Sequence, residues 1–107
     1  MDGLGIEQWS RTFGLGADDC AECVQEVSDG SYILAGMTRS YEAWEQAWLV
    51  RTDASGDERW TVRFGGEGWE YGRCVSPTSD TGFIMVGETT SYGAGGQDAY
   101  LVYYRPL

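Results

Sequence analysis

The sequence predicts an all-β fold made of two copies of one four-stranded unit. Sixteen glycines and only two prolines in 107 residues are typical of a turn-rich β protein. The chain also repeats itself with the offset that separates Trp9 from Trp60, and the same offset relates Phe13 to Phe64 and Cys23 to Cys74. Sequence periods of about 40 to 50 residues that are rich in strand and turn signals are typical of β-propeller blades.

The whole chain, residues 1–107, is interpreted as one domain. The first repeat covers about 2–52 and the second about 53–107, with an insertion of one residue near the end of the second. Two blades of four strands each are therefore predicted, cut out of phase with the chain ends.

Each predicted strand has its own signal, taken in chain order. Segment 7–13 matches 58–64, whose residues alternate between apolar and polar, so both are expected to be half-exposed outer strands. Segments 21–27 and 72–78 carry small residues on one face, which suits a crowded innermost strand. Segments 32–38 and 83–89 are apolar on both faces, as expected of strands that are covered on both sides. Segments 47–52 and 99–104 complete the units, and Gly56 supplies the turn after the first of them.

The order of these strands predicts how the chain assembles. It begins with an outer strand and ends after a third strand, so 7–13 is expected to complete a blade begun by the last three strands of a neighbouring copy. Two blades cannot close a ring, and broad apolar faces would stay in water. A head-to-tail homo-oligomer is therefore predicted, as a six-bladed trimer or alternatively an eight-bladed tetramer.

The repeats also resemble a known family. WSRTFG at 9–14 and WTVRFGG at 60–66, with SDGSYILAGMTRSY at 28–41 and SDTGFIMVGETTSYG at 79–93, are similar to bacterial and archaeal β-propeller repeats. Those repeats read W-x-x-T-F-G-G followed by D-G-G-Y-I-x-A-G-x-T. The resemblance covers nearly the whole chain and implies the propeller fold, but it implies no particular function.

Composition narrows the function classes. The net charge of −10 argues against nucleic acid as a partner, and the chain has no histidine for a catalytic triad or an imidazole metal site. No long apolar run predicts a signal peptide or a membrane helix. The three cysteines are interpreted as structural thiols, which favours a reducing, cytoplasmic compartment. No enzyme activity, cofactor or metal is predicted.

Two loop sets at one end of the blades are the candidate ligand-binding residues. An indole that stacks on the C–H face of a sugar, beside carboxylates that accept from its hydroxyls, would make a glycan site. The first set is Trp44 with Glu42 and Glu45; the second is Trp69 with Glu67, Glu70 and Arg73. The alternatives are tryptophans that merely fill gaps between blades, a calcium site at Asp18 and Asp19, and a glycosidase carboxylate pair.

The expected function is therefore that of a non-enzymatic binding protein, a multivalent lectin-like propeller. The alternative is a structural or protein-interaction scaffold without a small ligand, such as a natural fragment or an engineered repeat protein.

Overall fold

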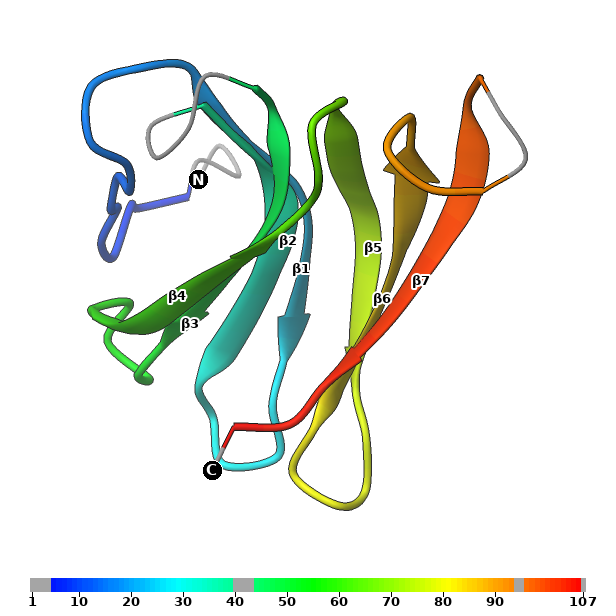
Figure 1. Ribbon diagram of the computed structural model, residues 1–107. Coiled ribbons are helices and arrows are strands. Elements are labelled where there is room, and N and C mark those ends of the chain that lie inside the picture. The colour runs from blue at the N-terminus through cyan, green and yellow to red at the C-terminus, as the bar shows by residue number, and fades with distance from the viewer. Residues whose placement is uncertain (1–4, 40–43, 94–95, 107) are drawn as a thin grey trace.

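A computed structural model describes residues 5–39, 44–93 and 96–106. These residues form seven β-strands and no helix (Figure 1). The strands are β1 (Asp19–Glu26), β2 (Tyr32–Thr38), β3 (Gln46–Thr52), β4 (Glu58–Phe64), β5 (Glu70–Pro77), β6 (Phe83–Thr89) and β7 (Asp98–Tyr104). The protein is therefore all-β, as the sequence predicts. No helix among the described residues is long and apolar enough to cross a membrane.

The strands form two antiparallel sheets in simple sequence order. The first sheet runs β1-β2-β3-β4 and the second β5-β6-β7. In Figure 1 they stand next to each other, and β5 packs against β1, β2 and β3. The predicted order of the four strands within one sheet holds for the first copy, and the first three of them recur in the second copy.

The core lies between the two sheets. Its buried side chains come from alternate positions of β2, β3, β5 and β6: Ile33, Ala35, Ala47, Leu49, Val75, Phe83 and Met85. Aromatic and valine side chains of β4 and β7 pack around this cluster. The apolar residues at the intervening positions of β2 and β6 face away from this interface. In β6 these residues, Ile84 and Val86, are exposed, so the predicted cover on both faces is not formed within the chain.

A β-bulge occurs at the same place in the first strand of each sheet, β1 and β5. The register shifts between Ala21 and Cys23 in β1, and between Gly72 and Cys74 in β5. The extra residues are Glu22 and Arg73, which are therefore repeat counterparts. A bulge re-aims the side chain of its extra residue, and here it brings these two opposite charges together between the sheets.

The predicted outer strand at 7–13 is the one element that the single chain does not form. Residues 5–13 carry no strand pairing and lie across the first sheet (Figure 1). A strand needs a partner strand for its backbone groups, and this segment pairs with neither β4 nor β7, the last strands of the two sheets. If 7–13 completes a blade of a neighbouring copy, Trp9 is expected to be buried against the C-terminal strands of that copy, and this stays a prediction.

Trp9 nevertheless repeats the packing of its counterpart, Trp60. The Trp9 and Tyr32 ring centroids are 5.9 Å apart at an interplanar angle of 62°, and those of Trp60 and Phe83 are 5.9 Å apart at 63°. Tyr32 and Phe83 are themselves repeat counterparts. Trp9 therefore lies against the first sheet as Trp60 lies against the second.

Candidate functional site

The loops expected to carry function emerge at one end of both sheets. The β4–β5 connection lies at the upper end in Figure 1, together with the segment that leads into β1. The ends of β2 and β6 and the starts of β3 and β7 lie at the same end. The β1–β2 and β5–β6 turns lie at the opposite end. The shared end follows from antiparallel pairing in sequence order. Successive strands run in opposite directions, so every second connection lies at the same end of the strands.

The first predicted set is only partly within the described residues. Trp44 is exposed, Glu45 is half-buried, and Glu42 lies outside the described residues. Glu45 Oε2 is 3.9 Å from Arg39 Nε, and Arg39 also pairs with Asp18 at 3.4 Å. The backbone carbonyl of Glu45 accepts a hydrogen bond of 3.0 Å from the Glu70 amide. The loop before β3 is thus joined directly to the start of β5.

The two predicted sets meet at Tyr71. The Trp69 and Tyr71 rings are 4.8 Å apart and tilted by 44°, and the Arg73 guanidinium lies 5.2 Å from the centre of the Tyr71 ring. Partial burial, and next the negative charge of Glu45, raise the pKa of Tyr71 above its ordinary value, and a hydrogen bond with Glu45 acts in the same direction. The phenol is therefore protonated at neutral pH and lies beside the Glu45 carboxylate.

The sequence analysis did not single out Tyr71. The available signal is that Tyr71 falls where the first repeat has Cys20. A large aromatic residue that replaces a small one next to a divergent loop marks a place where the two copies differ in surface chemistry.

Glu70 has an internal role. Its side chain is fully buried: Oε2 accepts a 2.7 Å hydrogen bond from Thr89 Oγ1, and Oε1 accepts one of 3.3 Å from the Gly66 amide. Its repeat counterpart Asp19 accepts from Thr38 in the same way. The carboxylate therefore holds the 65–69 loop onto the sheet, whereas Glu67 in that loop is exposed.

Arg73 bridges the two sheets. It hydrogen-bonds Glu22 at 2.7 Å and Glu88 at 2.6 Å, and the bond to Glu88 is the main cause that raises the pKa of its guanidinium. The two carboxylates partly neutralise its charge. The Tyr71 ring thus contacts both Trp69 and Arg73. The guanidinium N–H groups of Arg73 donate to the Glu22 and Glu88 carboxylates.

The thiols and acids do not gather into a metal centre in the part of the chain that the structure describes. The three cysteines are free thiols. A hydrogen bond with Cys23 is the first cause that raises the pKa of Cys74, which places these two repeat counterparts side by side.

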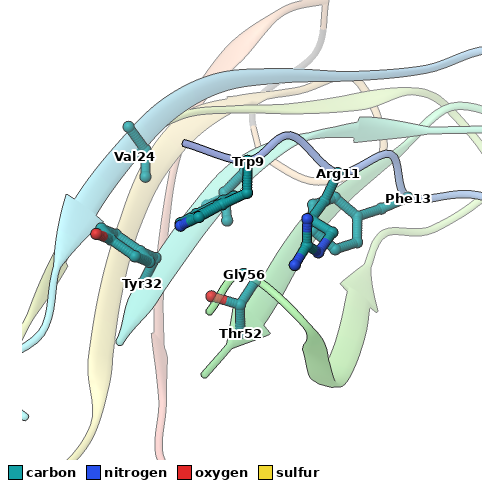
Figure 2. Close-up of a pocket in the computed structure, with 8 residues that line it drawn as sticks. Trp9, Arg11, Phe13, Val24, Tyr32, Thr52 and Gly56 are labelled. Atoms are coloured by element: carbon teal, nitrogen blue, oxygen red, sulfur yellow. The ribbon is translucent and has the colours of Figure 1, made fainter. Parts of the chain in front are cut away.

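A separate apolar groove lies between the N-terminal segment and the face of the first sheet that is turned away from the second sheet (Figure 2). Its volume is about 310 Å³. Its lining comes from the N-terminal segment, β1, β2 and the end of the β3–β4 hairpin: Trp9, Arg11, Phe13, Val24, Tyr32, Leu34, Thr52 and Gly56. None of the predicted ligand-binding residues lines it, and the sequence analysis did not predict it.

Comparison with known proteins gives no relative from which a role could be transferred: neither a protein-family model nor a curated protein sequence matches this chain.

Proposed function

We propose that this chain is a non-enzymatic, lectin-like protein that binds glycans at the loop end of a β-propeller ring. The observation that carries the proposal is the Trp69–Tyr71 pair with Glu45 beside it. A half-exposed indole offers a flat surface for the C–H face of a sugar, and the neighbouring phenol and carboxylate supply a donor and an acceptor for its hydroxyls.

The proposed contacts divide between direct and supporting residues. Trp69, Tyr71, Glu45 and Glu67 are the groups that a glycan would touch, and Arg73 supports the Tyr71 ring through its guanidinium. Glu70 supports the site by holding the loop. Trp44 with Glu42 makes a second, non-identical site of the same chemistry, since Trp44 is exposed at the same end.

The proposal includes assembly by head-to-tail blade completion. Three copies would form a ring of six blades, with four copies and eight blades as the alternative. A ring presents each loop set several times on one face, so individually weak sugar sites gain through avidity.

A scaffold without a small ligand is the second candidate. It is favoured by the internal engagement of Glu70 and Arg73, whose polar groups already have partners within the chain. In that case the aromatic and charged residues at this end would serve only to join the two sheets.

A glycan array followed by tryptophan fluorescence titration separates the two candidates. We expect the fluorescence to change with at least one sugar, Trp69→Ala to abolish one class of sites, and Trp44→Ala to abolish the other. Trp69→Phe is the matched control, because it keeps an aromatic face and should retain part of the affinity.

Light scattering on the same variants checks that the assembly is unchanged. A blank array, or binding that survives both alanine substitutions, would contradict the glycan proposal and favour the scaffold.

A further inference from the structure

The interface between the two sheets joins two different surfaces. The first sheet contributes Ile33, Ala35 and Leu49. The second contributes Val75, Phe83 and Met85, and all six side chains are at most 1% exposed. The protein therefore already contains one complete example of how one sheet of this repeat packs on the next.

The repeat places a second example of each surface on the outside of the molecule. The counterparts of the first surface are Ile84, Val86 and Leu101, here called the donor face, and they are 36%, 44% and 69% exposed. The counterparts of the second surface are Val24, Tyr32 and Leu34, here called the acceptor face. Val24 is 56% exposed and the other two are half-buried. The donor face belongs to the second sheet and the acceptor face to the first.

The N-terminal segment already packs on part of the acceptor face. Trp9 covers Tyr32 with the geometry that Trp60 shows on Phe83, and the groove of about 310 Å³ opens beside it (Figure 2). Trp60 and Phe64 are the repeat counterparts of Trp9 and Phe13, which line this groove. In the interface between the two sheets, Ile33 and Leu49 pack in one cluster with Trp60 and Phe64 and so occupy the place that the groove leaves open. Their counterparts on the donor face are Ile84 and Leu101.

Charge at the innermost strands favours the same pairing. Between the two sheets, Glu22 of the first meets Arg73 of the second at 2.7 Å. Because these residues are repeat counterparts, stacking the second sheet of one copy on the first sheet of the next places Arg73 near another Glu22. Packing two donor faces together would instead bring like sheets, and like charges, into contact.

We propose that the partner of this apolar surface is a second copy of the chain, whose acceptor face receives the donor face. The N-terminal segment of that second copy then lies beside β7, which pairs with β6 alone within the described residues, and supplies the missing fourth strand. This inference deepens the proposed assembly and is independent of glycan binding. Such head-to-tail contacts use two different surfaces of each subunit, so they extend or close into a ring.

Leu101→Glu tests the donor face, with Leu15→Glu as its matched control because both leucines are 69% exposed. The native mass of the unsubstituted chain should be a multiple of 11.8 kDa. Leu101→Glu should reduce the mass to that of one chain, because it puts a charge into the contact, and Leu15→Glu should leave the assembly unchanged. Circular dichroism checks folding, and Ile84→Glu replaces Leu101→Glu if the latter does not fold.

A mixing experiment tests whether the two faces are different. Val24→Glu alone should also be monomeric, because it puts a charge into the acceptor face. An equimolar mixture of Val24→Glu and Leu101→Glu should form a species of twice the chain mass, because each variant keeps the face that the other has lost.

A folded single-chain wild type, an assembled Val24→Glu variant or a mixture that stays monomeric would overturn the inference. Mass is measured without any sugar. A blank glycan array would therefore leave the inference standing, and a failed mass test would leave sugar binding to a single chain measurable.

Discussion

Glu70 shows at the scale of one residue why an acidic residue in a loop is not by itself a ligand contact. It is buried with Thr89 and Gly66 as hydrogen-bond donors, and Asp19 accepts from Thr38 in the first repeat. The two copies thus share a carboxylate that anchors the connection ahead of the innermost strand. Trp69, in the adjoining loop, owes its position to this anchor.

We expect Glu70→Ala to lower the free energy of unfolding by about 1–3 kcal/mol, because it leaves buried hydrogen-bond donors without acceptors. Glu67→Ala in the same loop is the control, and a change at an exposed site of this kind stays within about 0.5 kcal/mol. Urea unfolding at one fixed protein concentration measures both. Equal stability of the two variants would show that Glu70 does not anchor the loop.

The second strand of each sheet has a glycine where it pairs with the bulge of the first strand: Gly36 in β2 and Gly87 in β6. A Cβ on Gly36 would overlap the carbonyl oxygen of Cys20, and one on Gly87 would overlap that of Tyr71. Both obstacles are backbone atoms of the paired strand, so neither can move without breaking the ladder.

Gly87→Ala should therefore cost roughly 3–5 kcal/mol, at the upper end for one substitution, or prevent folding altogether. Gly36→Ala should behave alike, since it occupies the same place in the other repeat. Gly5→Ala, whose Cβ would meet nothing within 4 Å, should be close to neutral. Thermal unfolding followed by circular dichroism distinguishes them, and a stable Gly87→Ala protein would contradict the tight β5–β6 approach.

At the scale of the whole molecule, the N-terminal segment contributes both to the packing of the single chain and to the proposed assembly. It covers Tyr32 on the acceptor face and, in the proposed ring, completes the second sheet of a neighbouring copy. The same residues therefore protect an apolar surface in the single chain and close an edge in the assembly.

We expect deletion of residues 1–13 to abolish the defined oligomer and to cause aggregation, an effect much larger than that of Trp44→Ala. Light scattering during a concentration series measures this. Assembly of the truncated chain with the same number of copies as the full chain would show that blade completion by this segment is wrong.

The strands could be predicted from the sequence because their signals are local. Segment 58–64 alternates along its own length, and β4 has those bounds. The apolar pattern of 32–38 and 83–89 likewise predicted strands, and β2 and β6 occupy these ranges. The cover on both faces that the pattern also predicted is absent from β6, where Ile84 and Val86 are exposed. Segment 7–13 matches 58–64 in the repeat, but Arg11 stands where β4 has Val62. The structure places this segment in no sheet, and Trp9 packs on Tyr32 of the first sheet instead.

The candidate site could be predicted only in part. Its loops and both tryptophans follow from the divergence between the two repeats, which can be seen along the sequence. The burial of Glu70 and the contact of Tyr71 with Glu45 depend on two connections that are joined by one backbone hydrogen bond. That bond spans residues far apart in the chain.

The sequence by itself thus determined the duplication, the strand order and the end of the sheets at which the variable loops lie. Periodicity and repetition are properties of neighbouring residues, and they survive without knowledge of the packing. The tertiary structure alone decided that Arg73 meets Glu22, that Trp9 rests on Tyr32, and that the donor face stays exposed. Each of these depends on packing between segments that are distant in the chain, and that packing is set by the shape and volume of their side chains.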